Sequence, residues 1–98
     1  MFTVLLADDE DSVLEVLKCS IHWQELGVDK LLTASDGMAA LELFEQQQID
    51  LLVTDIRMPR MDGLELIQNV RSISPDTHCI LLTAYGEFEY AKQAIRLG

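Results

Sequence analysis

Short apolar runs alternate along the chain with longer stretches in which apolar residues recur every three or four positions. The apolar runs occupy residues 3–7, 31–34, 51–55 and 79–83. They show no polar alternation, which is typical of strands buried on both faces of a parallel sheet. We therefore predict four parallel strands separated by helices.

The stretches between the runs have the periodicity of amphipathic helices. Ser12 and Glu15 have the spacing of a capping box at the start of the first helix, residues 12–21, and Asp36-Gly37 opens the second. The order βαβαβαβα predicts an α/β fold, an open, doubly wound parallel sheet with right-handed crossovers. The apolar positions that define the four helices are Val13, Leu14, Leu17 and Ile21; Ala40, Leu41 and Phe44; Leu66, Ile67, Val70 and Ile73; and Phe88, Ala91, Ala94 and Ile95.

Length and charge narrow the class of protein. The 98 residues suffice for one small domain, which we take to span residues 1–98. The net charge of −10 argues against direct binding to nucleic acid or to an anionic membrane, since both require a cationic face. No apolar run approaches the roughly 20 residues of a membrane span, so we expect a cytoplasmic protein. Cys19 and Cys79 lie in apolar periodic segments, where we expect reduced, buried thiols.

Candidate chemistry lies at the carboxyl ends of the strands, where open α/β sheets bind their ligands. Asp8 and Asp9 follow the first strand, Asp55 closes the third, and Thr83-Ala84 ends the fourth. If the first and third strands are neighbours, three carboxylates converge. At about 4 Å and an effective dielectric near 20, each like-charged pair costs on the order of 4 kcal/mol, so a proton or a cation must be present. Oxygen ligands without a nearby His or Cys indicate Mg²⁺ or Mn²⁺ rather than zinc.

Acidic residues in loops also cap helices, and this is our interpretation of Glu10, Asp11 and Asp36. Asp55 is different, because it ends an apolar strand and is followed by Ile56, so it is poorly placed to cap a helix.

A carboxylate in such a crevice can also attack phosphorus and become an aspartyl phosphate. A cation there would screen the charge on the nucleophile and on the phosphoryl oxygens alike. Thr83 would offer a hydroxyl donor at the end of the adjacent strand, and the small Ala84 beside it would leave room for the phosphoryl group.

Three segments together resemble the receiver domain of two-component response regulators. They are Asp8-Asp9 after the first strand, the sequence DIRMPRMDG at residues 55–63 after the third, and Thr83-Ala84 after the fourth. The D-x-x-M-P-x-M-D-G pattern is highly specific, and the spacing matches over the whole chain. The resemblance implies a flavodoxin-like, CheY-like fold, in which Met58-Pro59 and Asp62-Gly63 shape the loop beneath the site.

The resemblance also implies roles for individual residues. Asp55 would accept a phosphoryl group from the phosphohistidine of a sensor histidine kinase. Asp9 and Asp55 would bind Mg²⁺ directly, together with the backbone carbonyl of Arg57, and Asp8 would bind it through water. Thr83 would move toward the phosphoryl group and report its arrival to the fourth helix.

Residues 83–95 and the Ile-His-Trp sequence at residues 21–23 are similar to receivers of multi-domain regulators of the AraC type, which are YesN-like. This similarity implies a C-terminal DNA-binding effector domain in the parent protein, with no nucleic-acid contact by this domain itself. Tyr85, Phe88 and Tyr90 are equally consistent with core and rim packing.

The chain departs from the family pattern at its C-terminal end. Receiver domains have a fifth strand, which ends in a lysine that contacts the phosphoryl group, and a fifth helix. The chain contains neither, and Lys92 falls within the predicted fourth helix, so it cannot take that role. We expect a truncated receiver with four βα units. Such a chain would expose an apolar sheet edge, with low stability or self-association, for example as a homodimer.

Two other functions fit part of the pattern. A Mg²⁺-dependent phosphohydrolase would use Asp55 as a turnover nucleophile, but that class commonly has an acid two residues later, where Arg57 stands. An interaction module that keeps only the fold would not need all three acids and Thr83. We therefore expect a phosphoacceptor that assists its own phosphotransfer and dephosphorylation, and not a turnover enzyme.

Overall fold

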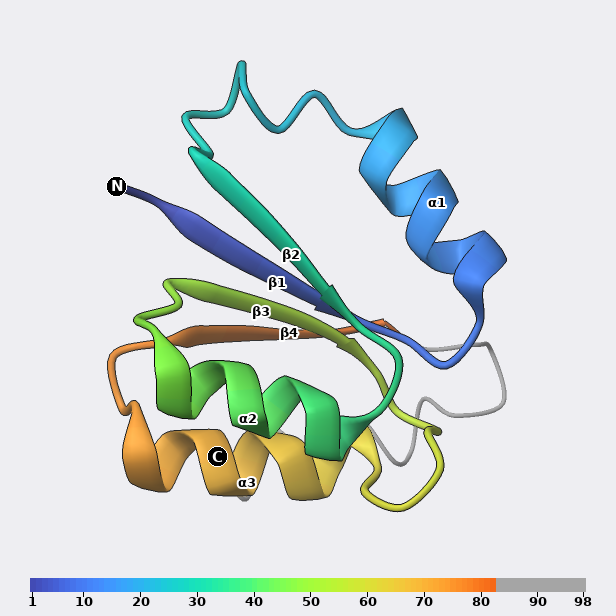
Figure 1. Ribbon diagram of the computed structural model, residues 1–98, viewed down its shortest axis with the longest axis vertical. Coiled ribbons are helices and arrows are strands. Elements are labelled where there is room, and N and C mark those ends of the chain that lie inside the picture. The colour runs from blue at the N-terminus through green and yellow to red at the C-terminus, as the bar shows by residue number, and fades with distance from the viewer. Residues whose placement is uncertain (83–98) are drawn as a thin grey trace.

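The computed structural model describes residues 1–82, where four strands and three helices alternate (Figure 1). The predicted fourth helix, together with Thr83 and Ala84, lies outside the described residues. Each expected element within residues 1–82 is present, with bounds that differ from the predicted ones by at most one residue where both were defined. The elements are β1 (Thr3–Ala7), α1 (Asp11–Ser20), β2 (Lys30–Ala34), α2 (Gly37–Gln46), β3 (Leu51–Asp55), α3 (Gly63–Ile73) and β4 (His78–Leu82).

The strands form one parallel sheet in the order β2-β1-β3-β4. Helices α2 and α3 lie side by side on one face, and α1 covers the other (Figure 1). Because β1 and β3 are parallel neighbours, their carboxyl ends meet at the same edge of the sheet. This confirms the α/β, CheY-like class and the adjacency on which convergence of the three carboxylates depends.

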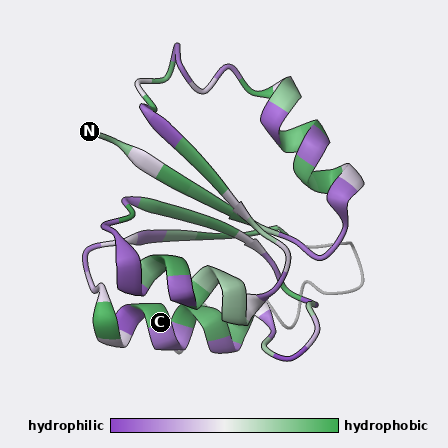
Figure 2. Ribbon diagram, viewed as in Figure 1, coloured by the Kyte–Doolittle hydropathy of each residue, from purple (hydrophilic) through white to green (hydrophobic). Residues whose placement is uncertain are grey.

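The sheet separates two apolar clusters, and β1 contributes to both because its side chains alternate between faces. Leu5 packs into the cluster under α2 and α3, whereas Val4 and Leu6 pack into the cluster under α1. All three are fully buried, and each such side chain contributes about 1.5–3 kcal/mol of transfer free energy. The apolar colouring of the strands and the mixed colouring of the helices reflect this arrangement (Figure 2).

The helix starts confirm one capping interpretation and correct another. The Asp36 carboxylate accepts a hydrogen bond from the Ala39 N–H at 2.8 Å and caps α2, as expected. The capping box of Ser12 and Glu15 was wrong. Helix α1 begins at Asp11, one residue before Ser12, and its N-cap residue makes no capping hydrogen bond through its side chain.

Two further features of the described part bear on the expectations. Cys19 is exposed rather than buried, because it lies off the inward stripe of α1, and Cys79 is half-buried; both thiols are free. Strand β4 is an edge of the sheet formed by residues 1–82, and its Ile80 is 48% exposed. Among the described residues, no helix has the length and apolar character needed to cross a bilayer.

Candidate functional site

Three carboxylates meet at the carboxyl edge of the sheet. Asp8 and Asp9 follow β1 directly, and Asp55 is the last residue of β3. One carboxylate oxygen from each lies within 4.8 Å of the other two. Asp8 is buried, Asp55 is half-buried and Asp9 is exposed, so the cluster opens toward solvent on the side of Asp9. The predicted convergence is confirmed, and within residues 1–82 it is the only such group of metal-ligating side chains.

The electrostatics of the cluster are unfavourable without a cation. Burial raises the pKa of Asp8, and the negative charges of Asp55 and Asp9 raise it further. The Glu10 N–H opposes this shift, because it donates a hydrogen bond of 2.9 Å to Asp8 Oδ1. A divalent cation would remove the repulsion. Three carboxylate oxygens are the donor type that Mg²⁺ prefers, so the residues present fit that ion.

The backbone around Asp55 is fixed on three sides. The Ile56 N–H donates to Asp55 Oδ1 at 2.8 Å, which orients the carboxylate. The Thr54 hydroxyl donates to the Asp55 carbonyl oxygen at 2.9 Å, and the Gly63 N–H donates to the Ile56 carbonyl oxygen at 2.7 Å. Helix α3 is capped instead by Asp62, which accepts the Glu65 N–H. Asp55 is therefore not the N-cap residue of any of the three described helices, as its place in the sequence predicted.

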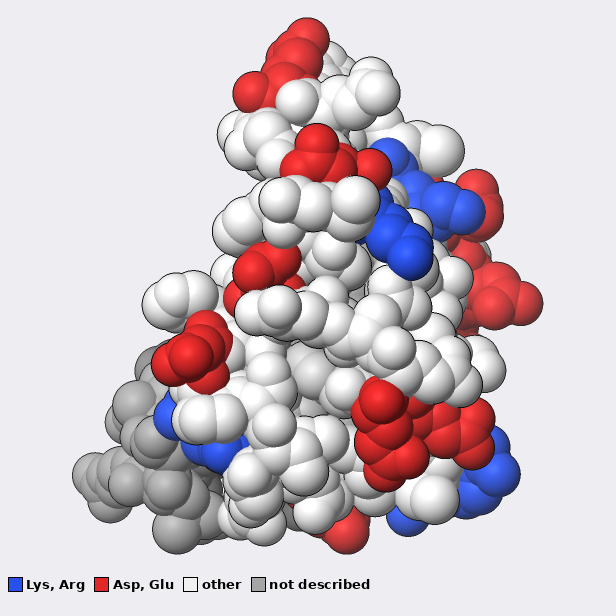
Figure 3. All heavy atoms as spheres, turned by 60° about the vertical axis from the view of Figure 1, so that its left-hand side comes forward, with Lys and Arg blue, Asp and Glu red and all other residues white. Residues whose placement is uncertain are grey.

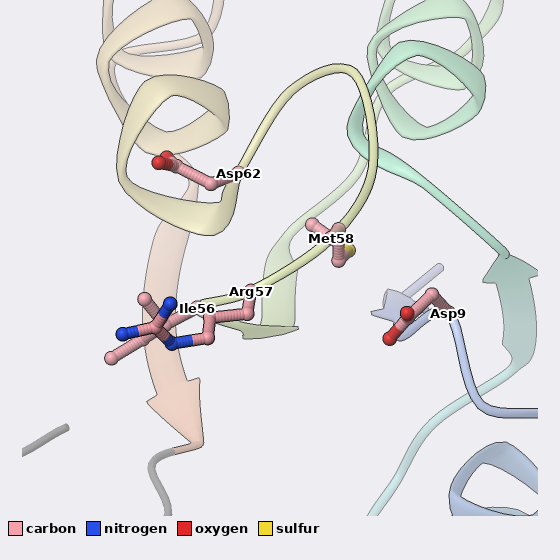
Figure 4. A pocket seen from close by; sticks show the side chains of 5 residues that line it. All are labelled: Asp9, Ile56, Arg57, Met58 and Asp62. Carbon is pink, nitrogen blue, oxygen red and sulfur yellow. The ribbon is translucent and has the colours of Figure 1, made fainter. Parts of the chain in front are cut away.

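An open pocket of about 340 Å³ lies beside the carboxylates, between the end of β1 and the loop that joins β3 to α3. In Figure 4, Asp9 faces this loop, and the Arg57 side chain extends away from Asp9. Met58, by contrast, is buried in the core cluster under α2 and α3, and Met61 packs against the same cluster. These two side chains anchor the loop by packing against the core. The pocket is lined by Asp9, Ile56, Arg57, Met58 and Asp62.

Residues 4–98 match the response regulator receiver domain family. The chain belongs to that family. Transcriptional regulatory protein YesN of Bacillus subtilis is 43% identical over 98 residues, which are all of this chain and 27% of YesN. This receiver domain therefore spans about a quarter of the length of that relative.

Solved receiver structures are similar in fold as well as in sequence. The receiver domain of AraT, a response regulator from Geobacillus stearothermophilus, has a TM-score of 0.92 and 43% identity, covering 99% of this chain and 75% of that one. Response regulator TrrA from Thermotoga maritima, solved in complex with Mg²⁺-BeF, has a TM-score of 0.80 and 36% identity, covering 96% and 81%. The receiver identification and the similarity to YesN-like and AraC-type regulators are thus confirmed.

One relationship at this edge of the receiver domain was not predicted. The guanidinium of Arg60 forms an ion pair with Asp36, which sequence reasoning treated only as a helix cap. The two residues are 24 positions apart; Arg60 occupies a variable position of the receiver motif at residues 55–63, and Asp36 lies outside that motif. The Asp36-Gly37 turn and the motif at residues 55–63 marked the two segments, but nothing in either pattern paired Arg60 with Asp36.

The surface of the receiver domain agrees with its acidic composition. On the face shown in Figure 3, basic side chains are separated by acidic groups and by uncharged surface. That face therefore carries no continuous basic stripe of the kind that binds a nucleic-acid backbone.

Proposed function

We propose that this receiver domain accepts a phosphoryl group on Asp55 from the phosphohistidine of a sensor histidine kinase, in a Mg²⁺-dependent reaction. The observation that carries the proposal is the approach of Asp8, Asp9 and Asp55 to within 4.8 Å at the carboxyl edge of the sheet. Membership of the receiver family supports the interpretation of this cluster as a phosphoacceptor site rather than an ordinary acidic surface.

In this proposal Asp9 and Asp55 bind Mg²⁺ (or Mn²⁺) through their carboxylates, with the backbone carbonyl of Arg57, and Asp8 binds it through water. The bound ion screens the negative charge on the nucleophile and on the phosphoryl oxygens. TrrA supports this assignment, since that similar protein was solved in complex with Mg²⁺-BeF. The raised pKa of Asp8 supports it too, because a cation relieves the repulsion that contributes to the shift.

The transfer step forms one bond and breaks one. A carboxylate oxygen of Asp55 attacks phosphorus, the P–N bond of phosphohistidine breaks, and the imidazole leaves with its electron pair. With acetyl phosphate as donor, the P–O bond to the acetyl group breaks and acetate leaves. The Ile56 N–H keeps the carboxylate oriented, which reduces the entropy lost on reaching the reactive geometry. In this proposal the Thr83 hydroxyl donates a hydrogen bond to the phosphoryl group, and the small Ala84 leaves space for the phosphoryl group.

Output follows from a shift between two conformations that differ at the fourth-helix face. The proposed partners are the kinase, a C-terminal DNA-binding effector domain in the parent protein and a second copy of the domain in a homodimer. Relatives named as transcriptional regulators support these partners and the proposal of a cytoplasmic protein. The domain assists its own phosphotransfer and dephosphorylation without acting as a turnover enzyme.

The test is uptake of phosphate from acetyl phosphate in the presence of Mg²⁺, measured by intact-protein mass. We expect stoichiometric uptake by the wild type and none by Asp55→Asn, which keeps the size of the side chain but lacks the nucleophile. The matched control is Asp50→Asn, which removes the same charge at the amino ends of the strands, away from the site. There the Asp50 carboxylate accepts a hydrogen bond from the Thr3 N–H. Stoichiometric uptake by Asp55→Asn contradicts the proposal.

A further inference from the structure

Arg60 has a backbone conformation that is unusual for its residue type. Its φ is +69°, in the left-handed region, and it is the only non-glycine residue there within residues 1–82. This conformation is costly for an L-residue because Cβ approaches the following carbonyl oxygen, and glycine adopts it freely. An arginine at this position therefore needs a compensating interaction.

The ion pair with Asp36 is that interaction. The Arg60 side chain is 66% exposed, but the Asp36 side chain is only 10% exposed, so the pair is screened by solvent mainly on one side. The two Asp36 oxygens have separate partners: Oδ1 accepts the Ala39 N–H at 2.8 Å, and Oδ2 accepts from Arg60. Both contacts lower the pKa of Asp36, so the carboxylate is charged at neutral pH.

Backbone contact accompanies the ion pair. A Cβ added to Gly37 would lie 2.5 Å from the Met61 carbonyl oxygen, so the start of α2 touches the loop directly beside Arg60. At its base the same loop is closed by the hydrogen bond from the Gly63 N–H to the Ile56 carbonyl oxygen. The loop is therefore held at the strand end by β3 and at its tip by α2.

The β3–α3 loop, which these contacts hold in place, lines one side of the functional site. Within residues 1–82, four of the five residues that line the pocket beside the carboxylates come from residues 56–62, whereas Arg60 itself does not line it (Figure 4). Arg57, whose carbonyl is a proposed Mg²⁺ ligand, lies three residues before Arg60. Movement of the tip of this short loop would displace that carbonyl.

We propose that Arg60 and Asp36 are a positioning pair, which ties the tip of the β3–α3 loop to the start of α2 and thereby holds the Arg57 carbonyl ready for the cation. The inference rests on the proposed function of the site. Neither residue touches the reacting atoms, so the pair acts through the loop alone. Sequence position would not suggest this role, because the pair joins two turns that follow different strands.

The test uses two readouts, the thermal midpoint and the Mg²⁺ requirement of phosphorylation. A loss of site geometry should raise the Mg²⁺ requirement without lowering the thermal midpoint. Arg60→Gly removes the pair and relieves the left-handed strain, so we expect an unchanged or higher thermal midpoint. The Mg²⁺ concentration for half-maximal phosphorylation by acetyl phosphate should rise roughly three- to tenfold. Asp36→Asn, which keeps a capping oxygen, should raise it similarly. Arg71→Ala, which removes one positive charge from the exposed surface of α3, should leave it unchanged.

The double variant Asp36→Asn/Arg60→Gly decides whether the two residues act as a unit. We expect its Mg²⁺ requirement to match that of the more impaired single variant. A requirement equal to the product of the two single effects overturns the proposal, as does an Arg60→Gly protein that behaves like Arg71→Ala. If the wild type accepts no phosphoryl group, the proposed function fails. Mg²⁺ binding by calorimetry then tests the pair on its own: weaker binding by Arg60→Gly supports it, and equal binding overturns it.

Discussion

A Cβ added to Gly63 would lie 2.1 Å from the carbonyl oxygen of Asp55. The first residue of α3 thus lies directly against the backbone of the proposed phosphoacceptor. Only the absence of a side chain permits this approach, and the contact is with backbone that cannot move without displacing the end of β3. This contact therefore couples the start of α3 to the end of β3 at Asp55.

Replacing Gly63 with alanine should destabilise the fold by about 2–4 kcal/mol, because the added methyl group overlaps backbone atoms. Urea denaturation measures the change in the free energy of unfolding. Gly27→Ala is the matched control: nothing lies within 4 Å of its added Cβ, and only its φ of +89° opposes the substitution, at a cost of about 1–2 kcal/mol. Equal, small effects at both positions would contradict the close contact between Gly63 and Asp55.

The cap of α3 gives a second stability prediction. Asp62 accepts the Glu65 N–H at 2.9 Å, so Asp62→Ala should cost about 1 kcal/mol of unfolding free energy, and Asp62→Asn only a few tenths. Thermal or urea unfolding checks both values. If the alanine and asparagine variants were equally destabilised, the charge of Asp62 rather than its capping oxygen would be responsible.

The raised pKa of Asp8 predicts how stability depends on pH without a divalent cation. The folded protein binds this proton more tightly than the unfolded chain, so the contribution of Asp8 to stability falls as pH rises from 3.8 through its higher folded pKa. Asp8→Asn should remove that loss and raise the free energy of unfolding at pH 7. Unfolding in a chelator at several pH values measures it. A variant less stable than the wild type at pH 7 under these conditions would contradict the electrostatic argument.

Addition of Mg²⁺ should make the wild type more stable than Asp8→Asn, the reverse of their order without a divalent cation. At a free Mg²⁺ concentration about a hundred times its Kd, the wild type should gain about 2.7 kcal/mol of unfolding free energy. Asp8→Asn should gain much less, because one of the three carboxylates is gone. Denaturant titrations with and without Mg²⁺ provide the measurement. The control is a titration in which NaCl of equal ionic strength replaces the Mg²⁺ salt. An equal gain by both proteins would show that Asp8 does not help to bind the ion.

The sheet was predictable because its strands carry an unambiguous pattern. The bounds of β1 and β3 match the predicted runs, since all residues of these strands are buried or half-buried and no polar alternation interrupts the pattern. The start of α1 was missed, because a serine with a glutamate three residues later also occurs inside a first helical turn. The exposure of Cys19 was missed for a similar reason: hydrophobic character does not place a residue on the buried face of a helix.

At the site, the carboxylates were predictable and the contact that supports them was not. Asp8, Asp9 and Asp55 all lie at strand ends, so adjacency of two strands was enough to bring them together. The pairing of Arg60 with Asp36 depends on how the loop before α3 approaches the turn before α2. No periodicity in the sequence encodes that approach. The three-dimensional structure reveals it through the left-handed backbone of Arg60 and the ion pair with Asp36.

The central claim concerns which carboxylate receives the phosphoryl group. Reduction of the phosphorylated protein with borohydride converts an aspartyl phosphate to homoserine, and peptide sequencing then locates the converted residue. The account predicts homoserine at position 55, in a yield that follows phosphate uptake, with aspartate retained at positions 8 and 9. Homoserine at position 8 or 9, or stoichiometric phosphate uptake with aspartate intact at position 55, would contradict it.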